Sequence, residues 1–537
     1  MNTAIHEGLD FFQITALRYP IGGAFYPLNL FNPLVNSLLQ TIFNAVASYN
    51  VIIILQITLS AFGMYLLVKN LINNKIAAFI SGIIYGYSPF FIVSIYNGVD
   101  ELFSAGMIPL TVLFLFKSFK EEGYKNTIMA AIFLVLTTCF SLYYGLMVGM
   151  VAAIFFIFRI LSQRGKYIIK VVKKFILFFL LASLLISPLI WKFQNFLKAP
   201  NKVVFTSEST PEDTLEEIDK FSYPDVLQYF RISPFGIKQF DLTYSRDVIL
   251  VTYLGYIVIF LSLIGGLLRE RKKQTKPWVF LAVLFFIFSL GPYLYFNKQR
   301  LFLFGHFIPL PYLLFFKYVP FFWTMGNPHR FTIITIFSLS VLSGFAICEI
   351  IKQFKDKFHF LVGIFVSGAI LFEYIVFSPT LYPIPSIDAR PYKYYTKLSK
   401  EKGGFGIIEL PLFHRYFMRG KGFYMQAIHR KGVMQTMSFK PPFEDIRNNT
   451  FLKYISYLNR IQVGAPILKD EEFSPPITDL RQSLDELKRY DFKYIIVHDK
   501  LFYSKDVSEK THQFLRGLLD KPVDVDDKDS IIVYRIK

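Results

Sequence analysis

Apolar residues along this chain are gathered into long, uncharged runs separated by short polar segments. Runs of about 18 or more apolar residues are typical of helices that cross a lipid bilayer. We therefore predict a polytopic α-helical membrane protein, in which SLYYG (141–145) forms a turn between the fourth and fifth spans. The pattern predicts about ten such spans, near residues 50–68, 76–96, 103–116, 127–141, 142–158, 175–193, 248–268, 277–295, 331–350 and 358–378.

Two other apolar segments are shorter than a bilayer requires. LVNSLLQTIFNAVA (34–47) has too few residues, and PLPYLLFFKYVPF (309–321) is interrupted by prolines. Apolar segments of about 10–14 residues suit the membrane surface or a re-entrant position better than a span. We expect both segments to be interfacial or re-entrant helices.

The pattern changes after residue 380, where shorter periodic segments follow a proline-containing linker. FGIIEL (405–410) predicts a strand, and an apolar stripe at helical spacing over 477–490 predicts a helix with Thr478 as its N-cap. The order strand, helix, strand (491–499), helix (506–521), strand (530–536) predicts a small α/β domain. The predicted organisation is an outer loop with an interfacial helix over 1–49, a transmembrane domain over 50–380, and a soluble domain over 381–537.

Composition agrees with this class. Hydrophobic residues make up 53% of the 537 residues and charged residues 18%, whereas soluble proteins are roughly 25% charged. The net charge of +19 does not indicate a nucleic-acid partner, because Lys and Arg lie mainly in short loops between the predicted spans. Cys139 and Cys348 both lie inside apolar runs, which indicates small core residues and neither a disulfide nor a metal site.

The charges of alternate loops predict the orientation of the chain. One set of loops is neutral or acidic and includes YNGVDEL (96–102), SLYYG (141–145) and the long loop 194–247. The other set is basic, and loops rich in Lys and Arg stay in the cytoplasm. The prediction is the cytoplasmic (inner) membrane, with loops 194–247 and 296–330, the first 49 residues and the C-terminal domain outside it. The basic loops are 68–75, 117–125, 159–174, 269–276 and 352–357.

The first residues, HEGLDFF (6–12), are thereby placed outside although no apolar segment precedes them in this chain. A short tail can cross a membrane by itself. An upstream span missing before Met1 is the simpler interpretation, and we expect the N-terminus to be truncated in this way.

Ionisable residues gather at the predicted outer ends of the spans. A carboxylate there can act as a general base toward an acceptor hydroxyl or hold a divalent metal, and Arg can bind phosphate through two hydrogen bonds. This combination suits a substrate linked to a lipid phosphate. The predicted catalytic residues are Asp10, Asp100 and Glu101; the substrate-binding residues are Glu7, Asn97, His329 and Arg330; and Asp100 with Glu101 would hold Mg²⁺ or Mn²⁺, the one cofactor considered.

Each candidate also has a plainer interpretation. Asp100 and Glu101 would also fit a solvated loop, and His329 and Arg330 would also anchor a helix end at the lipid headgroups. Tyr143 and Tyr144 fit the aromatic belt of a membrane surface. No charged residue lies near the middle of a predicted span, which weakens an ion-coupled transporter.

Several segments resemble the C-type (GT-C) superfamily of multi-pass membrane glycosyltransferases, in particular its poorly characterised prokaryotic members with an extracytoplasmic C-terminal domain. The resemblance covers nearly the whole chain and consists of hydrophobic spacing with Pro, Gly and Tyr landmarks. It is carried by RYPIGGAFYPLNLFNPL (18–34), GMYLLVKNL (63–71), GIIYGYSPFFIVSIYNGVDELFSAGMIPLTVLFL (82–115), SLYYG (141–145), FSYPDVLQYFRISPFG (221–236), LGPYLYF (290–296), PLPYLLFFKYVPFF with NPHRF (309–331), ELPLFHRYFMRGKGFYMQAIHRKGV (409–433) and YIIVHDKL (494–501).

The resemblance implies transfer of a sugar, as in mannosyltransferase-like members, from a polyprenyl-phosphate donor to an acceptor outside the cytoplasmic membrane. It implies an essential acid in the first outer loop, which is Asp10 here or a residue upstream of Met1. Asp100 and Glu101 match the acidic pair of the second outer loop, and Arg330 matches an arginine that opens a late span. A second arginine, four residues earlier in relatives, is replaced by Gly326.

The leading hypothesis is therefore a glycosyltransferase whose partners are membrane lipids and a polyprenyl-phosphate sugar donor. Two alternatives remain: a non-catalytic membrane scaffold with a glycan- or partner-binding outer domain, and a lipid or polysaccharide transporter. The sequence leaves open the sugar, the acceptor and the oligomeric state.

Overall fold

The computed structural model of the chain describes most of its residues. Glu7 and Asp10 lie outside the described residues, as does most of the long loop 194–247. The described residues are 13–14, 16, 19–20, 22–24, 29–163, 165–198, 211–221, 224–230, 253–297, 299–319, 322–377, 384, 386, 388–412, 424–434, 448–463, 474–502 and 504–536.

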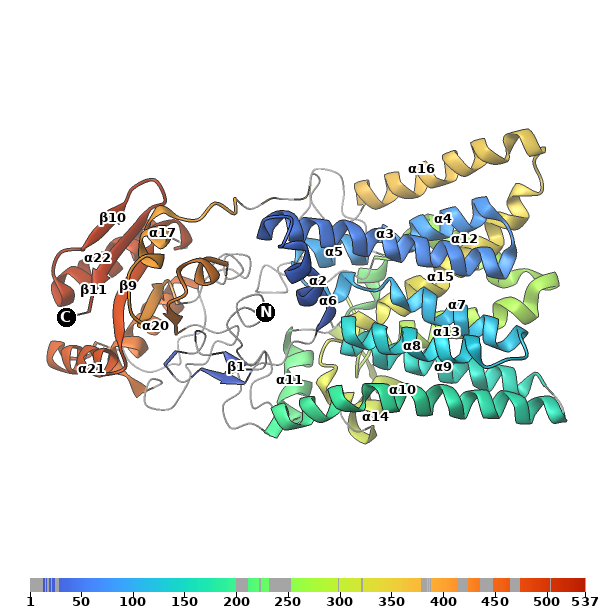
Figure 1. The fold of residues 1–537 in the computed structure, drawn as a ribbon, viewed down its shortest axis with the longest axis horizontal. Helices are drawn as coiled ribbons and strands as arrows, with labels where there is room; N and C mark the ends of the chain where they lie inside the picture. The colour runs from blue at the N-terminus through green and yellow to red at the C-terminus, as the bar shows by residue number, and fades with distance from the viewer. Residues whose placement is uncertain are drawn as a thin grey trace. The chain divides into compact units, whose positions relative to one another are not determined.

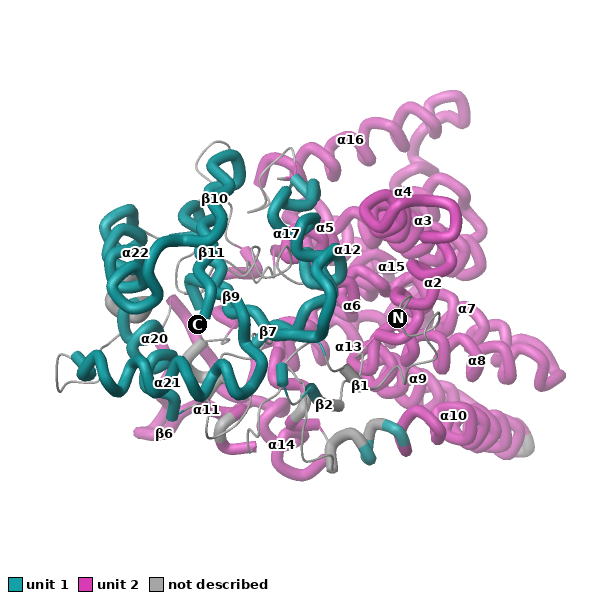
Figure 2. The backbone as a smooth tube through the Cα atoms, turned by 60° about the vertical axis from the view of Figure 1, so that its left-hand side comes forward, with its two compact units in different colours: residues 1–27, 192–208, 387–537 teal, residues 28–191, 209–386 magenta. Residues whose placement is uncertain are grey.

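The chain forms two compact units (Figure 2). Unit 1 contains residues 1–27, 192–208 and 387–537, and unit 2 contains residues 28–191 and 209–386.

Unit 2 is a bundle of long helices that lie alongside one another (Figure 1). Each of the ten predicted spans overlaps a helix of this bundle. The helices are α2 (Phe31–Leu39), α3 (Ala45–Ile72), α4 (Lys75–Gly86), α5 (Pro89–Tyr96), α6 (Asp100–Phe103), α7 (Met107–Lys120), α8 (Lys125–Phe140), α9 (Leu142–Leu161), α10 (Lys166–Lys198, with its last turns in unit 1), α11 (Pro211–Phe221), α12 (Tyr256–Leu267), α13 (Lys272–Ser289), α14 (Pro311–Tyr318), α15 (Thr332–Ile351) and α16 (His359–Phe377).

Within the described part of the chain, six helical segments are long and apolar enough to cross a membrane, which confirms a membrane protein with many apolar helices. Two shorter apolar helices, Lys125–Phe140 and Tyr256–Leu267, accompany them. The total of ten crossings stays a prediction. The six segments are Ala45–Ile72, Lys75–Tyr96, Asp100–Lys120, Leu142–Leu161, Pro328–Ile351 and Asp356–Phe377.

Two local predictions are wrong because a capping residue starts a new helix within the segment. Segment 34–47 is not one helix, because α2 ends at Leu39 and α3 begins at Ala45 behind Asn44, whose side-chain oxygen accepts from the Ala47 amide at 2.9 Å. SLYYG is not a turn: only Ser141 separates α8 from α9, and its hydroxyl caps the new helix by accepting from the Tyr144 amide.

The basic loops meet at one end of unit 2. The Lys120 ammonium donates to the Asn70 carbonyl at 3.3 Å, and the buried Lys174 ammonium donates to the carbonyls of Ser118 and Glu121 at the C-terminus of α7. These contacts place loops 68–75, 117–125 and 159–174 together.

The last two basic loops join the same end. Arg271 pairs with Glu349 at 3.0 Å, so loop 269–276 lies beside the C-terminal end of α15. Loop 352–357 directly follows this end of α15. Trp278, at the start of α13, packs on Phe116 near the end of α7, with 5.7 Å between ring centroids. We call this end of unit 2 the basic end.

Unit 1 contains a mixed five-stranded sheet in the order β10-β11-β9-β7-β8. Apolar side chains pack on both of its faces, so the small C-terminal mixed α/β fold is confirmed. Thr478 is not the N-cap of its helix, which follows Pro476 without a side-chain cap. The elements are α17 (Lys393–Ser399), β7 (Gly406–Leu410), β8 (Gly432–Val433), α20 (Thr450–Val463), α21 (Ile477–Arg489), β9 (Phe492–His498), α22 (Lys505–Leu519), β10 (Asp524–Asp526) and β11 (Ile531–Arg535).

A segment near the N-terminus belongs to this sheet domain. β1 (Gln13–Ile14) pairs with β2 (Gly23–Ala24), and the Tyr19 amide donates to the Val433 carbonyl at 3.1 Å. The Tyr19 ring covers Gly406 and Gly432, where an added Cβ would come within 2.5 Å and 2.2 Å of it. Residues that precede the helical bundle in the sequence and residues that follow it therefore belong to one compact unit.

Candidate functional site

The predicted acidic pair lies at the end of unit 2 opposite the basic end. After α5, Gly98 adopts a φ of +67°, which favours glycine, and the chain turns into α6 with Asp100 and Glu101 in its first turn. Arg330 lies in a short 3-10 helix, Pro328–Phe331, directly before α15. The Glu101 carboxylate and the Arg330 guanidinium form an ion pair at 2.8 Å, with side chains only 9% and 13% exposed. The structure thus joins two residues that are 229 positions apart in sequence (330 minus 101).

Two tyrosines of α9 complete this pair. The Tyr143 ring lies against the Arg330 guanidinium, 4.2 Å from ring centroid to Cζ. The Tyr144 hydroxyl donates to the Leu102 carbonyl and so holds α6. A guanidinium that stacks on an aromatic face is restricted to one plane, and it keeps N–H donors that can bind an anion. The interpretation as belt aromatics is wrong for Tyr144, which is fully buried. For Tyr143 it leaves out the contact with the Arg330 guanidinium.

Asp100 is held by a different set of groups. The Asn29 amide donates to the Asp100 carboxylate at 3.0 Å, and the Asn32 amide donates to the Asp100 carbonyl at 3.3 Å and to the Ser104 hydroxyl at 2.6 Å. Gln56 of α3 donates in turn to the Asn32 side chain at 3.0 Å. This network ties α2 and α3 to α6.

Asn29 and Asn32 were missed by the sequence analysis. The signal for them was the NLFN spacing (29–32), which places both side chains near the start of α2, and the lone Gln56 in an apolar run.

The other predicted residues are placed less centrally. His329 is buried beside Arg330, and its Nδ1 has no hydrogen-bond partner among the described residues, as is also true of the Arg330 Nε. Asn97 is buried at the C-terminal cap of α5, three residues before Asp100. The parts of Glu7 and Asp10 in the site stay predictions, since both lie outside the described ranges.

Asp100 and Glu101 form a partial set of metal ligands. Across the residues that the structure describes, no group of three or more His, Cys, Asp or Glu side chains is placed to hold a metal ion. The Glu101 carboxylate already pairs with Arg330, and the Asp100 carboxylate accepts from Asn29. Binding of Mg²⁺ or Mn²⁺ by these two residues therefore stays a prediction.

A second polar cluster lies in unit 1, at the carboxyl ends of the parallel strands β7 and β9. The Tyr395 hydroxyl donates to Glu409, and His498 lies 3.0 Å from that hydroxyl and 3.6 Å from the Glu409 carboxylate. Burial by itself would raise the pKa of Glu409, but His498 and Tyr395 hold this pKa below its usual value. His429 stacks on Tyr395 at 5.0 Å.

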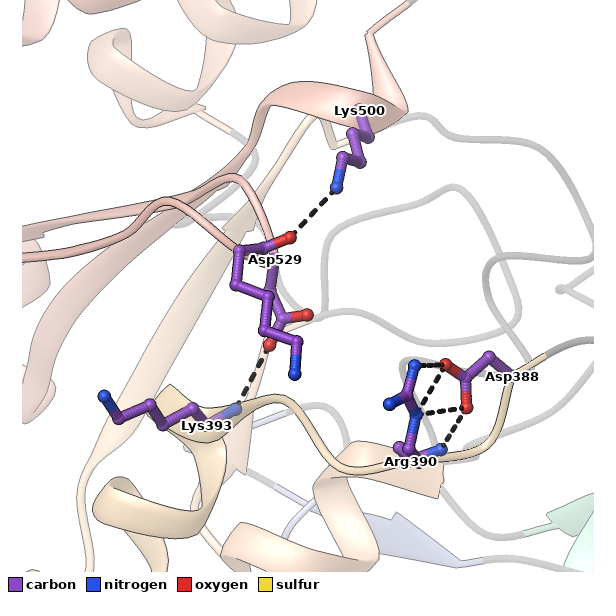
Figure 3. A network of polar contacts seen from close by, with 6 residues as sticks. Asp388, Arg390, Lys393, Lys500 and Asp529 are labelled. Atoms are coloured by element: carbon purple, nitrogen blue, oxygen red, sulfur yellow. Dashed lines mark hydrogen bonds and ion pairs between the residues drawn. The ribbon is translucent and has the colours of Figure 1, made fainter.

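The rim beside this cluster is charged and exposed (Figure 3). The Lys393 amide donates to the Asp529 carboxylate at 3.2 Å, and Arg390 pairs with Asp388 at 2.6 Å. The Lys500 ammonium donates to the Lys528 carbonyl at 3.1 Å. These contacts link the start of α17, the end of β9 and the β10–β11 turn. The charged residues of the rim therefore have a structural role, which is to hold these segments together.

No protein-family profile matches the sequence, and no curated protein matches it either. Among solved structures, the chain is similar to the arabinofuranosyltransferase AftD from Mycobacteria, with a TM-score of 0.51 and 11% identity over 98% of this chain. A variant of the same protein gives a TM-score of 0.53 and 12% identity over 98% of this chain. The chain spans 36% and 38% of those structures, little more than a third of their length. At this identity the similarity shows the fold alone.

Removing one member of the buried ion pair is expected to destabilise unit 2. Glu101→Gln leaves the Arg330 charge buried without its partner, which typically costs about 3 kcal/mol or more. The double variant Glu101→Gln with Arg330→Gln should recover much of this loss. A thiol-reactive dye that reports the exposure of Cys139 and Cys348 on heating measures the effect. A loss of stability in the double variant equal to the sum of the losses in the two single variants would contradict a direct pairing.

The sheet domain is expected to lose stability in mild acid through His429. Its Nδ1 accepts from the Lys431 amide at 3.0 Å, and burial lowers the pKa of His429 from 6.5 to about 4. Between these values the unfolded chain binds a proton that the folded chain excludes. The stabilisation is therefore complete above pH 6.5 and is lost as the pH falls toward 4, by a total on the order of 3 kcal/mol.

Pulse proteolysis in urea at pH 7 and pH 5, with fragments from residues 387–537 followed by mass spectrometry, measures this dependence. His429→Gln keeps an acceptor for the Lys431 amide and should flatten the pH profile. Equal pH slopes for the two proteins would show that His429 is not the group responsible.

Proposed function

We propose that this protein transfers a sugar from a polyprenyl-phosphate donor to a lipid, glycan or protein acceptor at the outer face of the cytoplasmic membrane. The observation that carries the proposal is the buried Glu101–Arg330 pair, held at one end of a helical bundle whose fold is similar to that of a membrane glycosyltransferase. A carboxylate and a guanidinium side by side offer a proton acceptor for a hydroxyl and a binding group for a phosphate.

The charge distribution supports the orientation. The basic end of unit 2 would face the cytoplasm, because loops rich in Lys and Arg are retained there. The Glu101–Arg330 pair would then lie at the outer surface. Contacts of Tyr19 with the sheet domain support an even number of crossings between residues 24 and 387, since both segments must lie on one side of the membrane. Ten crossings satisfy this condition.

In the proposed reaction the acceptor oxygen attacks the anomeric carbon of the donor. The bond between that carbon and the phosphate oxygen breaks, and the polyprenyl phosphate leaves with the bonding electrons. The acceptor proton passes to a carboxylate, which is Glu101, Asp100 or the undescribed Asp10. Arg330 stabilises the negative charge that develops on the departing phosphate, and inversion at the anomeric carbon follows from this single displacement.

The ion pair adds a sequence of events to this proposal. While Glu101 is paired with Arg330, its carboxylate is engaged by the guanidinium and is not placed to accept a proton from an acceptor hydroxyl. A donor phosphate competes with Glu101 for the same guanidinium. Binding of the donor would thus release Glu101 at the moment when a base is needed. Asp100, held by Asn29, would orient α6 in both states.

The first assay uses the protein reconstituted in lipid vesicles with a labelled polyprenyl-phosphate pentofuranose, the sugar class suggested by the name of the solved relative. Hexose-linked donors follow, in keeping with the GT-C resemblance. Transfer by the wild type is compared with Glu101→Gln, Asp100→Asn and Arg330→Gln.

We expect Glu101→Gln and Arg330→Gln each to reduce transfer by about 100-fold or more, since each removes a proton acceptor or a phosphate contact. Glu122→Gln is the matched control, because this exposed acid lies at the basic end and pairs with Lys170. Undiminished transfer by the combined variant Glu101→Gln with Asp100→Asn would remove both residues from the reaction. No transfer with any donor, but retention of glycans by the wild type, would favour the non-catalytic scaffold.

A further inference from the structure

A small β-hairpin follows α13 and carries apolar side chains into open space. β5 (Phe302–Leu303) pairs with β6 (His306–Phe307), with Phe302 opposite Phe307 and Leu303 opposite His306. Phe304 and Gly305 form the two-residue turn between them. At the tip, Phe302 is 63% exposed, Leu303 is 55% exposed and Phe304 is 92% exposed. In Figure 2, β6 lies at the margin of unit 2.

The turn itself makes this exposure unusual. Phe304 has a φ of +50° and Gly305 a φ of +80°, so both central residues lie in the left-handed region. Two-residue hairpin turns of this kind favour Asn-Gly, because a bulky side chain is sterically disfavoured at positive φ. In water, Phe304 would be unfavourable both for its backbone and for its exposed ring. An apolar solvent around the tip removes the second of these disadvantages.

The base of the hairpin has the chemistry of a membrane surface. The Arg300 guanidinium lies 4.0 Å from the centroid of the Phe307 ring, 4.6 Å from that of Tyr293 and 5.6 Å from that of Tyr295. Its Nε donates to the Tyr295 hydroxyl at 3.0 Å. Arg and Tyr are characteristic of the headgroup region, where the charge meets phosphates and the rings meet acyl chains.

The hairpin is also at the correct level of the bundle. The backbone before it pairs with the backbone after it, through Leu294 to Ile308 at 3.3 Å and Leu310 to Pro292 at 2.9 Å. This base directly follows the end of α13, where Phe288 packs on Phe331, the neighbour of Arg330, at 5.5 Å. The hairpin therefore leaves unit 2 at the helix ends, which is where a bilayer surface lies around a helical bundle.

We propose that the hairpin tip, Phe302–Phe304, inserts into the lipid leaflet that borders the Glu101–Arg330 end of the bundle, with Arg300 at the level of the lipid phosphates. The occupant of this apolar surface is lipid, because the hairpin leaves unit 2 at the ends of its apolar helices and changes from an apolar tip to a cationic base over one hairpin. The proposal is independent of sugar transfer and stands if no transferase activity is found.

Depth measurements on the full chain test this insertion. Spin labels are placed by Phe304→Cys and, separately, by Val525→Cys on the exposed strand β10, in a background of Cys139→Ala and Cys348→Ala. Both proteins are reconstituted in vesicles of zwitterionic and anionic phospholipid. At position 304 we expect collisions with oxygen to exceed those with a water-soluble nickel complex several-fold. Position 525 should show the opposite ratio.

Two outcomes would overturn the proposal. One is a ratio at position 304 that equals the ratio at position 525, which would place the tip in water. The other is a tip that the nickel complex reaches in vesicles but not in native membranes, which would indicate a protein partner. In a separate pair of proteins labelled through Leu303→Cys, addition of Phe304→Asn should keep the turn, since Asn suits it, yet at least halve the oxygen-to-nickel ratio. An unchanged ratio there would also contradict insertion of Phe304.

Discussion

A charge can remain inside an apolar bundle only if another group compensates it, and this constraint organises unit 2. Glu101 and Arg330 satisfy it for one another at 2.8 Å, and Tyr143 covers the guanidinium. Because α6, α9 and the 3-10 helix before α15 supply these three residues, the pair fixes helices that are distant in sequence. Glu373 in α16 follows the same rule: it accepts from the Tyr253 hydroxyl at 2.7 Å and from backbone amides at the start of α12.

Much of this architecture is predictable from the sequence because long apolar runs have one stable form in lipid. The helices of the bundle are of this kind. The principal strands of the sheet domain were predictable on a different ground, as short apolar runs; β9, for example, covers Phe492–His498 where 491–499 was expected. The short elements were not predictable. β8 has two residues and is defined by its partner β7, and Tyr19 is placed by two glycines more than 380 residues away.

The candidate site divides in the same way. Asp100, Glu101 and Arg330 were identifiable because they are ionisable residues at the predicted outer ends of apolar spans. The direct pairing of Glu101 with Arg330 was not, since no local pattern encodes a contact between α6 and the start of α15. Asn29, Asn32 and Gln56 are uncharged and common in loops, so only the observed hydrogen bonds distinguish them from ordinary capping residues.

The distinct surroundings of the two acids bear on which one could take a proton. Asp100 accepts from a neutral amide, and it would have to break a network that holds α2 and α3 in place in order to move. Glu101 pairs with the Arg330 guanidinium, which a donor phosphate can bind in place of the carboxylate, because guanidinium forms charge-assisted hydrogen bonds with both groups. If binding of the donor releases the base, the base must be the acid whose partner the donor phosphate can bind. That acid is Glu101, so Glu101 is the better candidate for the base and Asp100 is the positioning residue.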